Sequence, residues 1–103
     1  MSQLLLTLYS RKGCCLCNGL EQKLRSIPFD RLNPPTQLLV LDIDGEGVDQ
    51  MERLRYDLKV PVLVLRSFEI SQSFELPRVS PRLKEEALFE WLQKTINKSL
   101  DFD

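Results

Sequence analysis

Apolar residues form three short, nearly continuous runs, at residues 3–9, 38–43 and 62–65. Runs of this length and density are typical of strands that are buried on both faces of a sheet. Residues 68–74 instead alternate between apolar and polar side chains, which predicts a fourth strand with one exposed face. The gap at residues 66–67 is short, so we expect the third and fourth strands to form an antiparallel hairpin.

Between these runs, apolar residues recur at the three- and four-residue spacing of helices. A first helix is predicted over residues 14–27, where Pro28 ends it, and a shorter one over residues 47–58. Ser80 is expected to cap the last helix, with Pro81 in its first turn. The apolar positions of this last helix, which we expect in the core, are Leu83, Ala87, Leu88, Trp91, Leu92 and Ile96.

The predicted order of elements is β-α-β-α-β-β-α. The first two strands, joined by a helix, predict a right-handed parallel crossover. The α/β fold should contain a four-stranded mixed sheet flanked by three helices. Residues 29–37 contain Asn33-Pro34-Pro35 and are expected to form a loop. A chain of 103 residues fits one domain, residues 1–103, with a core of useful size.

All three cysteines lie in one segment, Gly13-Cys14-Cys15-Leu16-Cys17, between the first strand and the first helix. A Cys-x-x-Cys pair at a strand-to-helix turn is typical of redox-active dithiols. The helix N-terminus, together with Arg11 and Lys12, favours a thiolate at Cys14 and should lower its pKa. Cys17 lies on the same helical face and could attack the Cys14 sulfur. Cys14 is therefore predicted to be the nucleophile and Cys17 the resolving thiol.

The role of Cys15 stays open. It is a bystander, a regulatory or glutathione-modified thiol, or an extra metal ligand. Two other interpretations of the whole segment also stay open: cysteines that are only packed in the core, and a module that binds a metal or an iron–sulfur cluster. Zinc usually takes four Cys or His ligands, whereas this chain has three cysteines and no histidine, so no metal ligand is predicted.

The net charge of -1 gives no indication of a nucleic acid or a membrane surface as partner. The first residues lack the basic region of a signal peptide, and no apolar run approaches the length of a membrane span. We therefore expect a cytoplasmic monomer, in which a dithiol stays reduced at rest.

Three segments resemble the bacterial glutaredoxin-like proteins of the thioredoxin-fold superfamily. Residues 8–17 have that family's apolar strand, basic residue and Gly-Cys-x-Leu-Cys pattern. Residues 41–44 are similar to its second strand, and residues 55–64 to its helix end and proline-led third strand. The resemblance implies a thioredoxin fold and a thiol–disulfide oxidoreductase with no bound cofactor. Its substrates would be protein disulfides or glutathione mixed disulfides, and its reductant a thiol such as glutathione.

The resemblance also implies a cis peptide bond at Val60-Pro61, which would leave the backbone of Val60 free to pair with a substrate. An ordinary trans proline that opens the third strand is the alternative. Arg11, Lys12 and Lys59 could meet a glutathione carboxylate, because anions favour cationic surfaces.

Glutaredoxins that use glutathione usually carry a Gly-Gly pair after the fourth strand. Residues 73–80 contain no glycine, so a backbone cradle for the other end of glutathione is not predicted.

Overall fold

The computed structural model describes residues 3–67, 73–80 and 82–100. Within this part of the chain, the order of elements confirms the predicted β-α-β-α-β-β-α layout, with one short 3-10 helix, η1, added. The elements are β1 (Leu4–Ser10), α1 (Cys15–Arg25), η1 (Phe29–Arg31), β2 (Thr36–Asp42), α2 (Gln50–Tyr56), β3 (Val62–Ser67), β4 (Ser73–Glu75) and α3 (Glu85–Leu100).

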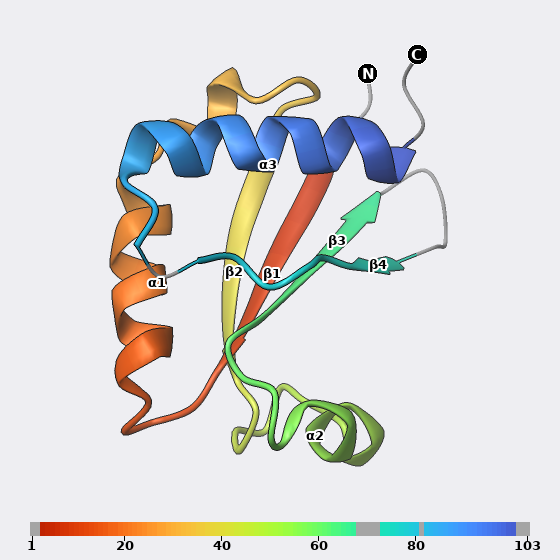
Figure 1. Cartoon of the computed structure of the whole chain (residues 1–103). Coiled ribbons are helices and arrows are strands. Elements are labelled where there is room, and N and C mark those ends of the chain that lie inside the picture. Colours follow the sequence, from red (N-terminus) through yellow and green to blue (C-terminus); the bar gives the residue numbers. More distant parts are fainter. Residues whose placement is uncertain (1–2, 68–72, 81, 101–103) are drawn as a thin grey trace.

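The four strands form one mixed sheet, as the sequence predicts, and their order in the sheet is β2-β1-β3-β4. β1 runs parallel to β2 and antiparallel to β3, and β3 runs antiparallel to β4. In Figure 1, α1 and α3 lie across one face of the sheet, and α2 lies at its end. β1 and β2 finish, and β3 begins, at the same end of the sheet. The connection after β1, the connection after β2 and the connection before β3 therefore meet at this end.

Side chains from the two faces of the sheet enter two cores. Leu4, Leu6 and Leu8 point to the larger core, under α1 and α3. Leu88, Leu92 and Ile96 of α3 are buried there, and Leu83 and Trp91 pack against it, whereas Ala87 is half-buried.

Tyr9 belongs to the smaller core on the α2 side of the sheet, and its ring lies 4.8 Å from that of Tyr56 of α2. The Tyr9 hydroxyl donates a hydrogen bond to the Glu52 carboxylate and accepts one from Arg66 at 3.2 Å. These contacts join β1, β3 and α2 across the smaller core.

Several predictions about local structure are wrong. Residues 66–67 are the last two residues of β3 and not the gap between the third and fourth strands. α3 begins at Glu85, so Ser80 does not cap it; the Ser80 hydroxyl instead accepts the N–H of Arg82 in a turn before the helix. Residues 36–37 belong to β2 rather than to a loop, because the pairing of β1 with β2 starts at Leu4 opposite Thr36. Residues 68–72, the first part of the predicted fourth strand, and Pro81 lie outside the described residues.

α2 is shorter than the predicted helix at residues 47–58. It begins after Asp49, whose carboxylate accepts the N–H of Glu52 at 2.8 Å and caps the helix. Tyr56 of this helix is buried, but Met51 and Leu54 are exposed to solvent. Among the described helices, none is long and apolar enough to cross a bilayer.

Candidate functional site

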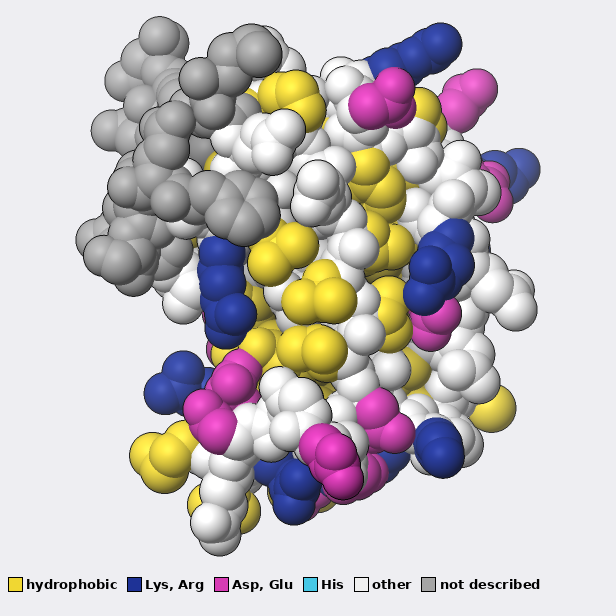
Figure 2. Space-filling model, turned by 180° about the vertical axis from the view of Figure 1, so that it is seen from behind, with side chains coloured by type: hydrophobic (Ala, Val, Ile, Leu, Met, Phe, Trp, Pro, Cys, Tyr) yellow, Lys and Arg dark blue, Asp and Glu magenta, His cyan; other side chains and the backbone are white. Residues whose placement is uncertain are grey.

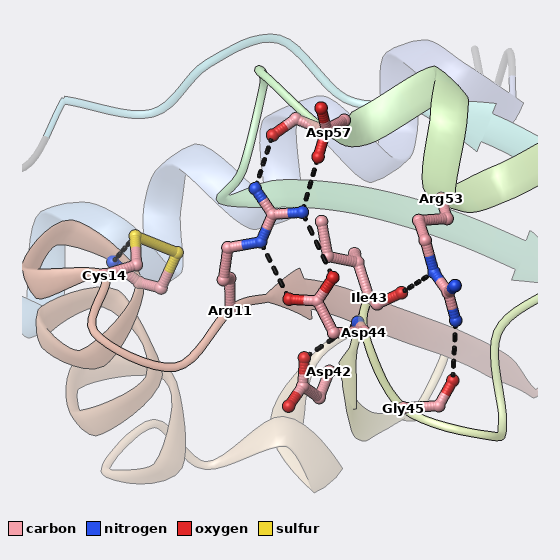
Figure 3. Close-up of polar contacts among 9 residues, drawn as sticks. Arg11, Cys14, Asp42, Ile43, Asp44, Gly45, Arg53 and Asp57 are labelled. Atoms are coloured by element: carbon pink, nitrogen blue, oxygen red, sulfur yellow. Dashed lines mark hydrogen bonds and ion pairs between the residues drawn. A yellow bond between two sulfur atoms is a disulfide. The ribbon is translucent and has the colours of Figure 1, made fainter.

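Cys14 and Cys17 are joined by a disulfide across the first turn of α1, with their Cα atoms 5.2 Å apart. This Cα separation lies within the range of ordinary protein disulfides. The structure therefore brings together the two thiols that the Cys-x-x-Cys spacing pairs, and Figure 3 shows their bond at the start of the helix.

The backbone around Cys14 places its sulfur at the positive end of α1. Gly13 has a φ of +81°, a conformation that side-chain-bearing residues rarely adopt, and this turns the chain out of β1. Cys14 then takes the N-cap position, where its Sγ accepts the N–H of Cys17 at 3.1 Å. A backbone N–H that points at the sulfur stabilises a thiolate more than a thiol once the disulfide is reduced.

The three cysteines differ in how much solvent reaches them. Cys17 is fully buried, Cys14 is half-buried, and Cys15 is exposed and carries a free thiol. An incoming molecule can therefore approach the sulfur of Cys14 more readily than that of Cys17. The Cys15 side chain is exposed whereas that of Cys17 is buried, so the two lie on different sides of the helix. This exposure does not assign Cys15 a role.

Arg11 lies on the side of the turn that faces α2, and its guanidinium is held by two carboxylates (Figure 3). Its Nε and Nη2 donate to the Asp44 carboxylate at 2.9 and 3.2 Å. Its Nη1 donates to the Asp57 carbonyl at 3.0 Å, and its Nη2 also donates to the Asp57 carboxylate. Hydrogen bonds from Arg11 hold the pKa of Asp44 below its usual range, and those to Asp44 and Asp57 raise the pKa of Arg11.

This arrangement changes the interpretation of Arg11. Two carboxylates neutralise its charge, so little of that charge is left to stabilise a Cys14 thiolate or to attract an anion. Arg11 instead ties the turn after β1 to the connection after β2, through Asp44, and to the connection before β3, through Asp57. The sequence identified the cation but not its two partners.

The Val60-Pro61 peptide bond is cis, and it lies in the connection that Arg11 holds through Asp57. Pro61 is half-buried, and Val60 packs against the smaller core. A second cis bond, Asn33-Pro34, precedes β2 and was not predicted.

A groove runs beside the disulfide, between α1 and the segment that follows β4. It consists of two adjoining hollows of about 350 and 280 Å³ that share Leu20, Pro61, Arg78 and Val79. Cys15 and Leu16 line the first hollow, and Lys59 lines the second. Cys14 does not line either hollow, so the groove borders the reactive pair through its neighbour Cys15.

The groove includes residues that sequence reasoning missed, above all Arg78. Residues 73–80, which include Arg78, were compared with the Gly-Gly segment of glutaredoxins because they contain no glycine. That comparison did not identify Arg78 as a binding residue. Lys59 lies in the groove as a predicted cation, whereas Lys12 is exposed but does not line it. In the part of the chain that the structure describes, no group of three or more Cys, His, Asp or Glu side chains could hold a metal ion.

Comparison with known proteins agrees with this fold. The sequence profile of the glutaredoxin-like domain (DUF836) matches residues 5–93, so the chain belongs to the glutaredoxin-like family. A solved structure titled "Structure of a malarial protein" superposes with a TM-score of 0.57 over 91% of this chain and 98% of that chain; at 14% identity this likeness shows the fold alone.

Another solved structure, target protein XcR50 from X. campestris, is 26% identical over 86% of this chain and 96% of its own, with a TM-score of 0.49. No curated protein matches the chain. The family and the fold together define a thioredoxin-fold redox module that contains a Cys14–Cys17 pair.

Proposed function

We propose that this protein is a thiol–disulfide oxidoreductase that works through Cys14 and Cys17. One observation carries the proposal: the two cysteines are bonded across the first turn of α1, with Cys14 at the N-cap and Cys17 buried behind it. Inert core cysteines would not need a glycine turn, a helix N-terminus and partial exposure at the same position. The proposed place of action is the cytoplasm, where the pair is reduced at rest and the protein acts as a monomer.

The reaction begins with the reduced pair. The Cys14 thiolate attacks one sulfur of a substrate disulfide, a Cys14–substrate mixed disulfide forms, and the other substrate sulfur leaves as a thiolate that takes a proton from water. Cys17 then loses its proton and attacks the Cys14 sulfur, which releases the second substrate thiolate. Two electrons have passed to the substrate, and a thiol reductant reopens the Cys14–Cys17 bond by the same exchange in reverse.

Substrates would bind along the groove that borders the pair. The backbone at Val60-Pro61 is the proposed contact for an extended segment, and Lys59 and Arg78 are the proposed contacts for anionic groups, with Lys12 near the turn. A protein disulfide or a glutathione mixed disulfide could supply such a segment. Glutathione is the proposed reductant, because a hollow of about 350 Å³ lies in the size range of small-molecule sites.

Trapping of intermediates tests the proposal. With a small disulfide as substrate, C17S should accumulate a mixed disulfide on Cys14, since no resolving thiol remains. C14S should form no mixed disulfide at residue 14 and should lose turnover. C15S is the matched control, because it removes the exposed neighbouring thiol, and it should turn over like the wild type. Equal residual activity in C14S and C17S would contradict the assigned roles.

A further inference from the structure

The helix α2 presents its apolar side chains to solvent. Met51 and Leu54 of α2, and Leu58 in the turn that follows it, lie at spacings of three and four residues and are 72, 68 and 93% exposed. Tyr56, on the other side of the helix, is buried in the smaller core. Figure 2 shows apolar side chains that protrude at the lower end of the molecule, where α2 lies. We call Met51, Leu54 and Leu58 the α2 patch.

The α2 patch lies at the same end of the sheet as the disulfide. Figure 1 shows α2 and the first turn of α1 at this end, where β1 and β2 finish and β3 starts. Leu58 directly follows Asp57, which Arg11 binds to the turn that carries Cys14. Leu16, beside Cys17 on α1, is also 55% exposed.

The charges beside the patch favour an acidic partner. Arg55 and Lys59 are exposed at the C-terminal side of α2. Of the neighbouring carboxylates, Asp57 is bound by Arg11 and Glu52 by Arg66, whereas the exposed Glu46 and Asp49 precede α2, at the opposite end of the helix from Arg55 and Lys59. Opposite charge across an interface speeds encounter and fixes orientation.

The size of the surface favours a transient partner over a second copy of the chain. A stable interface needs about 800 Å² from each side, more than two side chains of a seven-residue helix and one from the turn after it supply. Short-lived redox encounters bury less than about 1,200 Å² in total.

We propose that the α2 patch is the docking surface for a protein that exchanges disulfides with Cys14, and that this protein presents an apolar surface bordered by acidic side chains. The inference rests on the proposed function and adds to it the class of substrate. It separates recognition, on α2, from the chemistry, at the first turn of α1.

Synthetic helical peptides test this surface. A 20-residue peptide is about 30 Å long, and the molecule measures 36 × 31 × 19 Å, so such a peptide can reach from α2 to the disulfide. The first probe has a leucine face bordered by glutamates and carries one cysteine as a disulfide with 2-nitro-5-thiobenzoate. The second replaces the glutamates with lysines. The third probe is the small disulfide alone, 5,5′-dithiobis(2-nitrobenzoate).

The wild type should reduce the glutamate peptide with a kcat/KM about tenfold higher than that of the variant M51S/L54S. A ratio of about tenfold is the effect expected when two exposed apolar contacts with the peptide are lost. Both proteins should reduce the small disulfide equally. The control variant L39S removes an exposed leucine of β2 and should keep the wild-type rate on every probe. Urea unfolding should show that M51S/L54S folds as stably as the wild type, because both side chains are exposed.

Equal rates of the wild type and M51S/L54S on the glutamate peptide would overturn the docking surface while leaving the proposed function intact. Equal rates of the wild type on the glutamate and lysine peptides would overturn the acidic character of the partner. A wild type that reduces none of the three probes would overturn the proposed function, and the docking surface with it.

Discussion

Arg11 donates hydrogen bonds to both the main-chain carbonyl and the carboxylate of Asp57, a residue 46 positions further along the chain. The same guanidinium also holds Asp44. The turn before Cys14, the connection before Val60-Pro61 and the connection after β2 are thereby fixed at one point. Arg11, which the sequence suggested as a cation that lowers the Cys14 pKa, acts in the structure as the residue that positions the loops around the reactive pair.

The variant R11Q should lose stability at neutral pH and not in acid. Arg11 holds the pKa of Asp44 below its ordinary 3.8, so the pair stabilises the fold above that pH, and the contribution disappears as the pH falls through the lowered value. Urea unfolding at pH 7 should separate wild type and variant, and at pH 2 the two curves should approach each other. A difference that grows in acid would contradict this account of the pair.

R11Q should also leave the reactivity of Cys14 nearly unchanged, because two carboxylates already neutralise Arg11. K12Q is the matched comparison. It removes an exposed cation next to Gly13 and should raise the pKa of Cys14. The rate of iodoacetamide alkylation against pH, measured on the reduced proteins, gives the Cys14 pKa of each variant. A clear rise of the Cys14 pKa in R11Q would restore the role that the sequence suggested for Arg11.

Tyr9 should make the fold sensitive to alkali. Burial and the hydrogen bond to Glu52 raise its pKa to about 12 from the ordinary 10.0. Between these values the folded state keeps a proton that the unfolded state loses, so stability falls as the pH rises from 10 to 12. The loss should reach up to about 2 kcal/mol, once partial solvent screening of Glu52 and Arg66 is allowed for.

Y9F removes the titrating group and keeps the ring that packs on Tyr56. Urea unfolding of both proteins between pH 9 and 12 should show a steeper loss of stability for the wild type than for Y9F. Parallel losses would show that Tyr9 keeps an ordinary pKa in the folded protein.

The order of elements and the reactive pair could be predicted because each depends on short-range patterns. Continuous apolar runs gave β1 and β3, and the spacing of Cys14 and Cys17 gave the disulfide. The start of α3 was missed because Ser80 and Pro81 have the composition of a helix start, which composition alone cannot separate from a turn.

The partners of Arg11 and the position of Arg78 depend on contacts between residues far apart in the chain, and no local pattern marks them. Which face of α2 is buried could not be predicted, for a related reason. The periodicity of Met51, Leu54 and Leu58 is that of a buried helix face, but the smaller core takes Tyr56 and Val48 instead.

Arg78 should matter for anionic substrates and not for neutral ones. R78S should lower kcat/KM about two- to fivefold for glutathione disulfide, which is the effect expected of one exposed charge pair, and the difference should shrink at high salt. The uncharged bis(2-hydroxyethyl) disulfide should react at the wild-type rate. K94S, which removes an exposed cation of α3 that does not line the groove, should change neither. Equal losses on both substrates would place the effect of Arg78 outside anion recognition.

The most direct test of the central claim is a redox titration against glutathione in which mass spectrometry maps the paired sulfurs at each potential. The account predicts one reversible two-electron step between a Cys14–Cys17 disulfide and two thiols, with Cys15 unpaired throughout. Its midpoint should lie between roughly -270 and -200 mV, the span of thioredoxins and glutaredoxins. A bond that stays closed below about -300 mV, as structural disulfides do, or one that pairs through Cys15, would contradict the account.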